Sequence, residues 1–236
     1  MINKDKHRKI LFEIIREIYS SPFAYALGFK GGTMLYFFYN LDRMSVDLDF
    51  DLLADQEAEE IRNFFRGLLK KYGEVKDDQD KRNTIFFLLS YEKHSHGIKV
   101  EISKRTSANS EYEFKNFYGT QVQCLRVSDS FAFKLVAATD RKRTAGRDFY
   151  DIYFFLKNNY DFNEKIVEER TGGSTEDYLR YLRKFIDEKI TNKMVLGGVG
   201  ELIEEDKKDW IRNKFKDELL AQLDFFLKEE YKKSTA

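Results

Sequence analysis

A short apolar stretch that carries an aspartate at every second position most constrains what this chain can fold into. Residues 46–52 read Val-Asp-Leu-Asp-Phe-Asp-Leu. Side chains alternate between the two faces of an extended strand, so Asp47, Asp49 and Asp51 share one face and apolar residues fill the other. Adjacent carboxylates raise one another's pKa unless a cation neutralises them, and oxygen ligands select hard ions such as Mg²⁺. The stretch is therefore either a metal-binding strand or a solvated strand with an acidic rim.

A glycine pair upstream of the aspartates favours the metal-binding strand. Residues 24–29 predict a short apolar strand, Gly31 and Gly32 a tight turn, and residues 33–39 the opening of an apolar helix. Glycine lets the backbone approach an anion closely, and the free N–H groups at a helix start point their positive end at it. Strand, turn and helix would together hold a phosphate opposite the aspartates.

The remaining sequence predicts an α/β front followed by an all-helical back. The expected elements are helices over 4–20 and 56–72, strands over 83–91 and 98–103, and helices over 128–143, 147–158, 175–190 and 208–229. Glycines at 172–173 and 197–198 predict loops, and Ser128 is the expected N-cap of its helix. We expect two domains, an α/β core over 1–126 and a helical domain over 127–236 that contributes to the active-site cleft.

Composition narrows the class of protein. The chain has 236 residues, of which 42% are hydrophobic, and its 41 basic and 41 acidic residues cancel. A net charge of zero gives no overall positive field of the kind that indicates a nucleic-acid binder. Any contact with a nucleic acid must therefore come from a local basic patch. The single cysteine, Cys124, excludes an internal disulfide and a cysteine-based zinc site and is interpreted as a structural thiol. With no apolar run long enough for a membrane span, we expect a cytoplasmic protein without a membrane contact.

Histidine and the basic residues carry weaker signals. His7, His94 and His96 are too few for a metal site of defined spacing. Lys134 lies beside the apolar stripe of its predicted helix, where a lysine could simply extend to water. The cluster at residues 141–143 is either a solvated helix junction or a contact to nucleotide phosphates or an RNA backbone.

Two blocks of residues resemble the AbiEii/AbiGii toxin family, a branch of the nucleotidyltransferases related to DNA polymerase beta. The first block is Gly31-Gly32-Thr33-x-Leu35 followed by Arg43-x-Ser45-x-Asp47-x-Asp49-Phe50, and the second is Lys134, Arg141 and Arg147-Asp148-x-x-Asp151. The blocks lie within residues 25–156, and Thr33 stands where the superfamily more commonly has serine. The resemblance implies an α+β fold, in which a polymerase-beta-like mixed sheet with flanking helices is followed by a C-terminal helical region.

The resemblance also implies roles for individual residues. Catalytic roles fall on Asp47, Asp49, Lys134 and Asp148, metal binding on Asp47, Asp49 and Glu101, and nucleotide binding on Gly31, Gly32, Thr33, Arg43, Ser45 and Arg147. Asp51 competes with Glu101 for the place of the third carboxylate, and Glu101 could equally be an ordinary exposed residue of a Lys/Glu alternation. Asp151 is expected to be a structural or supporting partner.

The implied activity is Mg²⁺-dependent transfer of a nucleoside monophosphate from an NTP to an acceptor hydroxyl, with release of pyrophosphate. The acceptor would be an RNA, such as a tRNA 3′ end, and the protein the toxin of a toxin-antitoxin or phage-defence system with a possible cognate antitoxin. Two alternatives stay open. One is a nucleotidyltransferase of small molecules of the antibiotic-modifying type, and the other is a nucleotide-binding regulator without turnover.

Overall fold

A computed structural model describes residues 3–92, 97–140 and 144–231. The chain forms two compact units, one comprising Met1–Asn40 with Ser45–Arg126 and the other Leu41–Met44 with Val127–Ala236. We call them the sheet unit and the helical unit. A four-residue segment from the front of the sequence therefore belongs to the unit that the back of the sequence forms.

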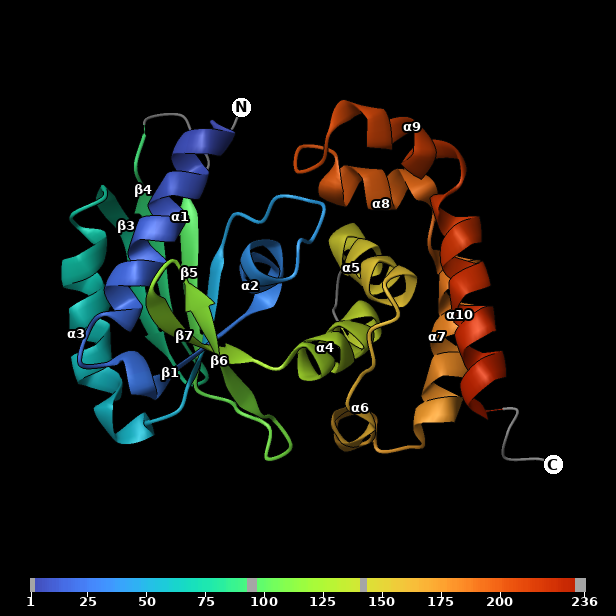
Figure 1. The fold of residues 1–236 in the computed structure, drawn as a ribbon, viewed down its shortest axis with the longest axis horizontal. Helices are drawn as coiled ribbons and strands as arrows, with labels where there is room; N and C mark the ends of the chain where they lie inside the picture. Colours follow the sequence, from blue (N-terminus) through green and yellow to red (C-terminus); the bar gives the residue numbers. More distant parts are fainter. Residues whose placement is uncertain (1–2, 93–96, 141–143, 232–236) are drawn as a thin grey trace. The chain divides into compact units, whose positions relative to one another are not determined.

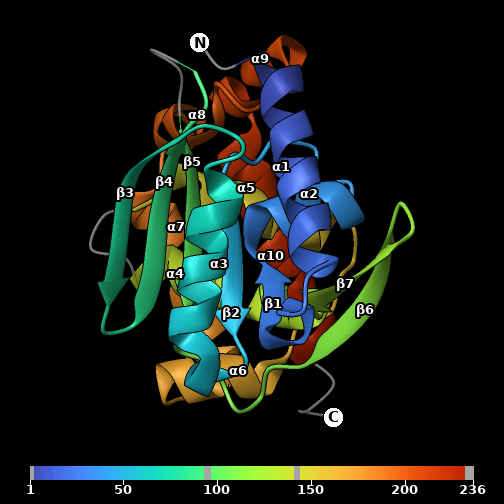
Figure 2. The ribbon, with the colours of Figure 1, turned by 90° about the vertical axis from the view of Figure 1, so that its left-hand side faces the viewer.

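A mixed sheet is the centre of the sheet unit (Figures 1 and 2). Within the described residues it has seven strands in the order β3-β4-β5-β2-β1-β7-β6. The strands are β1 (Leu27–Lys30), β2 (Leu48–Leu52), β3 (Glu74–Lys81), β4 (Thr84–Ser90), β5 (Ile98–Ser103), β6 (Tyr112–Phe117) and β7 (Thr120–Leu125). β2 pairs in parallel with β5, β1 pairs in parallel with β7, and the other neighbours are antiparallel. The strand with the aspartates is thus central and has a partner on each side.

Amphipathic helices cover one face of this sheet. Helices α1 (Lys4–Tyr19) and α3 (Ala58–Leu69) lie side by side in front of it in Figure 2. Phe65 of α3 contacts Phe50 of β2 and Phe87 of β4, with ring centroids 5.8 and 6.0 Å apart. The apolar residues of β2 therefore point into the core, as the alternation predicted. Helix α2 (Gly31–Phe38) connects β1 to β2, and two 3₁₀ turns, η1 (Ala24–Ala26) and η2 (Asp55–Glu57), precede β1 and α3.

Several predictions for the front half need correction. β1 begins at Leu27 rather than at residue 24, because residues 24–26 form η1. β2 begins at Leu48, so Val46 and Asp47 precede the strand. β3, β6 and β7 were not predicted. β3 reads Glu-Val-Lys-Asp-Asp-Gln-Asp-Lys and none of its residues is buried, so it lacks the apolar alternation by which a strand is recognised.

Helices alone form the described part of the back half (Figure 1). They are α4 (Val127–Asp140), α5 (Gly146–Lys157), α6 (Glu164–Thr171), α7 (Thr175–Lys189), α8 (Asn192–Val199), α9 (Glu205–Asn213) and α10 (Phe215–Tyr231). α5 is the core of the unit, since every residue from Asp148 to Leu156 is buried. A helix that is apolar on all sides is stable only when other helices surround it.

The back half is helical as predicted, but some elements and boundaries differ from the prediction. Gly197 and Gly198 lie inside α8 rather than in a loop. A Cβ atom at Gly198 would lie 2.9 Å from the main-chain nitrogen of Arg147, so this glycine allows α8 to approach the start of α5. The helix predicted over 208–229 is interrupted at Lys214, α6 was not predicted, and α4 begins at Val127, which places Ser128 in the first turn rather than at the N-cap.

The expected fold class is confirmed: a mixed sheet with flanking helices is followed by a helical region. Among the described residues, no helix combines the length and the apolar character that crossing a bilayer requires.

Candidate active site

Asp49 is the second residue of β2 and has a charged neighbour on each adjacent strand. In the antiparallel pairing with β1 it is opposite Lys30, and in the parallel pairing with β5 it is opposite Glu101. Residues in register on adjacent strands project to the same face of a sheet. Asp49 and Glu101 therefore share the face opposite Phe50, and Glu101 is exposed there. The residue chosen as the third carboxylate is thus a direct neighbour of the central aspartate.

Asp47 lies just before β2 and is held by hydrogen bonds rather than by strand pairing. Its Oδ1 accepts a hydrogen bond from the main-chain N–H of Lys99 at 3.3 Å. Its main-chain carbonyl accepts one from the hydroxyl of Thr33. Thr33 is fully buried in the first turn of α2. In this structure its hydroxyl therefore connects α2 to Asp47, and the predicted contact with a phosphate stays a prediction.

Gly31 brings the beginning of α2 against the Asp49 carboxylate. Its φ of +78° lies in the left-handed region, where residues with a Cβ are strained. A Cβ atom at this position would lie 2.2 Å from Oδ2 of Asp49. Two independent constraints thus require glycine here. Because Gly31 has no side chain, the N-terminal end of α2, which carries a partial positive charge, can lie beside the acidic strand.

We expect Gly31→Ala to reduce the nucleotidyl transfer that the sequence resemblance implies by about 10²-fold, because the added methyl group displaces Asp49 by roughly an ångström or more. Gly67→Ala is the matched control, since a Cβ atom there meets nothing within 4 Å. It lies in α3, where alanine should stabilise the helix by about 0.5–1 kcal/mol. Initial rates at saturating NTP and thermal unfolding of both variants test this expectation. Equal rates for the two variants would show that the close approach of Gly31 to Asp49 has no catalytic importance.

Both carboxylate oxygens of Asp51 already have partners within the protein. Its Oδ1 lies 2.6 Å from Nζ of Lys30, and its Oδ2 accepts a hydrogen bond of 2.9 Å from the hydroxyl of Tyr112. The side chain is 4% exposed. Both of its oxygens are thus engaged, and the assignment of the third carboxylate to Glu101 stays a prediction. No local pattern in the sequence connects Lys30 or Tyr112 to Asp51.

The donor set of the sheet unit fits a magnesium ion that is shared with a substrate. Within the described residues, no group of three or more His, Cys, Asp or Glu side chains stands ready to hold a metal ion. Mg²⁺ is usually bound by one or two carboxylates together with substrate phosphates, rather than by a closed cage of protein ligands. Asp47 and Asp49, with Glu101 in register, supply oxygen ligands of this kind. No ion or nucleotide is part of the structure.

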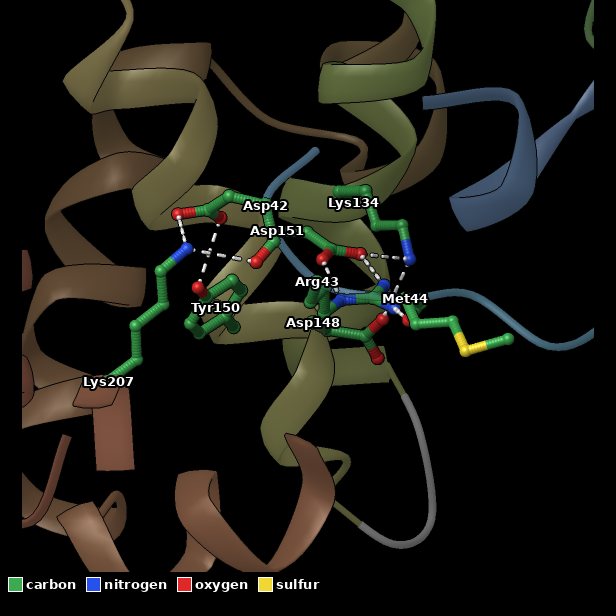
Figure 3. Close-up of polar contacts among 8 residues, drawn as sticks. All are labelled: Asp42, Arg43, Met44, Lys134, Asp148, Tyr150, Asp151 and Lys207. Carbon is green, nitrogen blue, oxygen red and sulfur yellow. Dashed lines mark hydrogen bonds and ion pairs between the residues drawn. The ribbon is translucent and has the colours of Figure 1, made fainter. Parts of the chain in front are cut away.

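Three residues of the second sequence block form a buried ion cluster with Arg43 in the helical unit (Figure 3). Nζ of Lys134 lies 3.2 Å from Oδ1 of Asp148 and 2.8 Å from Oδ2 of Asp151. Arg43 donates two hydrogen bonds of 2.7 Å to the two oxygens of Asp151. Arg43, Asp148 and Asp151 are all buried. Asp151 therefore joins Arg43 to Lys134, and the supporting role of Asp151 and the nucleotide contact of Arg43 stay predictions.

The pKa shifts in this cluster agree with its geometry. Burial alone would raise the pKa of Asp151, but Arg43 and Lys134 outweigh it and hold that pKa below the ordinary value. Burial alone would lower the pKa of Arg43, and the Asp151 carboxylate raises it above the ordinary value instead. Both groups are thus charged at neutral pH. Removing one partner of such a pair leaves an uncompensated charge in the interior, which destabilises the fold.

The structure places the other predicted residues as follows. Gly32 is buried in the first turn of α2, Ser45 is buried before β2, and Arg147 is half-buried in the first turn of α5. Cys124 is buried, and burial raises the pKa of its thiol to about 12, which agrees with a structural role. The basic cluster at 141–143 and the histidines at 94 and 96 lie outside the described residues.

Two solved structures share this fold over nearly the whole chain. JHP933 from Helicobacter pylori is 18% identical, with a TM-score of 0.61 and coverage of 99% of this chain and 97% of that one. A "putative nucleotidyltransferase" from H. pylori is 19% identical, with a TM-score of 0.62 and coverage of 99% and 98%. No significant match was found among curated protein sequences. The chain therefore has the same fold as these two proteins.

The family follows from the sequence itself. Residues 13–232 match the family described as nucleotidyl transferase AbiEii toxin, type IV TA system. The chain belongs to this family and is a nucleotidyltransferase of a toxin system. The resemblance seen in the two sequence blocks is confirmed.

Proposed function

We propose that the protein transfers a nucleoside monophosphate from an NTP to a hydroxyl group of an RNA, with Mg²⁺ as the cofactor. The observation that carries this proposal is the juxtaposition of Asp49 with the N-terminal end of α2, where Gly31 has no room for a side chain. A helix start beside a carboxylate pair combines a binding place for phosphate with ligands for the cation that accompanies it. Membership of the AbiEii family supports the reaction class.

In the proposed reaction the acceptor oxygen attacks the α-phosphorus of the NTP. The bond from that phosphorus to the bridging oxygen breaks, pyrophosphate leaves, and the hydroxyl proton is released. Asp47 and Asp49, with Glu101 beside them, would hold the metal ion. Bound Mg²⁺ supplies charge neutralisation on the phosphate oxygens and alignment for in-line displacement.

The chain's own groups bind and orient the triphosphate in this proposal. The N–H groups at the start of α2, including those of Gly32 and Thr33, point their positive end at an anion. Lys134 is proposed to balance negative charge on the triphosphate, with Asp148 as its partner in the same cluster. Asp151 and Arg43 fix the position of Lys134 through buried ion pairs.

The acceptor is the least constrained part of the proposal. We propose a tRNA 3′ end as the acceptor, a cognate antitoxin as the regulatory partner, and phage defence as the setting. Family membership supports a toxin-antitoxin context. A neutral chain with 41 basic and 41 acidic residues would have to bind RNA through a local surface.

Label transfer tests this function directly. Purified protein with Mg²⁺ is incubated with bulk tRNA and each of four α-³²P-labelled NTPs in turn, with an Asp49→Asn variant as the control. We expect label in the RNA and pyrophosphate in solution with at least one NTP, and neither with the variant. Unlabelled RNA, together with pyrophosphate release and a labelled product only when small-molecule hydroxyl compounds are added, would instead identify a small-molecule acceptor. Binding of NTP without pyrophosphate would identify a regulator.

A further inference from the structure

The backbone just before β2 is held by side chains rather than by strand pairing. β2 begins at Leu48, and its register with β5 is recorded from Leu48 onward. Asp47, a proposed metal ligand, therefore lies outside the ladder that aligns Asp49. A main-chain carbonyl without a strand partner needs another donor when water is excluded. The side chains that donate hydrogen bonds to the carbonyls of Val46 and Asp47 therefore help to determine the direction of the Asp47 side chain.

A buried histidine supplies the donor for Val46. His7 lies in α1 and is fully buried. Its Nε2 is 2.9 Å from the main-chain carbonyl oxygen of Val46, and its Nδ1 is 2.7 Å from the hydroxyl of Tyr91. A carbonyl oxygen can only accept, so Nε2 carries a proton. In the neutral ring Nδ1 then accepts from Tyr91, so the two hydrogen bonds together determine both the tautomer and the ring orientation.

Three elements thus converge on two residues. α1 reaches Val46 through His7, α2 reaches the carbonyl of Asp47 through Thr33, and the main chain of β5 reaches the Asp47 carboxylate at Lys99. The ring of Tyr91 also packs edge-on against His7, with centroids 5.4 Å apart. His7 is separated from Val46 by 39 residues, and nothing in the sequence around it predicted a role.

We propose that His7 is a positioning residue for nucleotidyl transfer, which fixes the Val46 carbonyl and thereby the direction in which Asp47 presents its carboxylate to the metal ion. The proposal rests on the proposed function, since it takes Asp47 as a metal ligand. Residues behind a metal ligand typically change metal affinity or activity by about 10–100-fold when they are replaced. If His7 had a purely structural role, replacing it would lower the stability of the protein without changing its metal requirement.

Two amide variants separate these roles. The amide of His7→Gln can reach the position of Nε2 and donate to Val46, whereas the shorter amide of His7→Asn reaches only the position of Nδ1 and Tyr91. Both place a neutral polar group at the same buried site. Leu11→Ala, at another fully buried position of α1, controls for general loss of helix packing.

The measurements are the Mg²⁺ concentration for half-maximal activity, kcat and KM for the NTP, and binding of Mn²⁺ with an α,β-methylene NTP analogue, followed by electron paramagnetic resonance. All are made at a temperature where circular dichroism shows each variant folded. We expect His7→Asn to raise the metal requirement and to weaken Mn²⁺ binding by about 10-fold or more. His7→Gln should restore most of the loss, and Leu11→Ala should bind Mn²⁺ as the wild type does.

Equal Mn²⁺ affinities for His7→Asn and His7→Gln would overturn the positioning role. So would a weakening in Leu11→Ala as large as that in His7→Asn. If Asp49→Ala is inactive while His7→Asn keeps the wild-type metal requirement, only the role of His7 fails. If Asp49→Ala keeps full activity, the proposed metal site fails and the role of His7 with it.

Discussion

Replacing Asp49 by alanine is expected to reduce nucleotidyl transfer by at least about 10²–10³-fold, the range seen when one electrostatic contact to a transition state is removed. Stability should change little. Asp49 projects from the face of β2 opposite Phe50 and is only half-buried, so its loss opens no cavity in the core. The measurement is pyrophosphate release at saturating Mg²⁺ and NTP, together with thermal unfolding of both proteins.

Asp80→Ala is the matched control for this experiment. Asp80 is an exposed strand aspartate of β3 with its own lysine partner, Lys104, at 2.5 Å. Asp80→Ala also removes a carboxylate from a strand, but at a position away from the proposed metal site, so we expect wild-type activity. If Asp49→Ala and Asp80→Ala are both as active as the wild type, Asp49 does not hold a metal ion in this enzyme.

The second large effect is expected in the buried ion cluster. Arg43→Met leaves Asp151 buried with Lys134 as its remaining cationic partner in the cluster, and Asp151→Asn leaves the buried Arg43 without its carboxylate. Removing one partner of a buried pair typically costs about 3–5 kcal/mol of unfolding free energy. Urea unfolding followed by circular dichroism should show a loss of this size in both variants.

Lys207→Met provides the control in the same unit. Lys207 pairs with Asp42 at 2.7 Å, but the two side chains are 31% and 46% exposed. An ion pair in contact with solvent contributes about 0–1 kcal/mol. A loss in Arg43→Met no larger than that in Lys207→Met would show that the buried pair contributes little to folding.

The same cluster predicts how stability depends on pH. The folded-state pKa of Asp151 lies below its ordinary value of 3.8, because Arg43 and Lys134 outweigh the effect of burial. A carboxyl group with a depressed pKa contributes stability that is complete above the ordinary pKa and is lost as pH falls through the folded-state value. The wild type should thus lose stability below about pH 4, and Asp151→Asn should lose less over that interval.

Arg43 shows why its role could not be deduced from its motif. In the sequence it belongs to the first block, and the family resemblance of that block implies a contact with the nucleotide. In the structure its guanidinium is buried against Asp151, which is 108 residues away. The segment Leu41–Met44 joins the helical unit through this pair, through the hydrogen bond from the N–H of Met44 to the carbonyl of Leu202, and through Asp42.

By itself, the sequence determined the local arrangement of the sheet unit around the aspartates. Alternation with a period of two placed Phe50 in the core and Asp49 on the opposite face. The adjacent glycines indicated a helix start ahead of the strand, although both lie inside α2 rather than in a turn before it. Such patterns are readable because backbone geometry links residues only a few positions apart. The tertiary structure alone decided that Asp51 pairs with Lys30 and Tyr112, and that His7 holds Val46. These contacts join residues 21 to 61 positions apart, and their formation depends on how separate elements pack rather than on any local pattern.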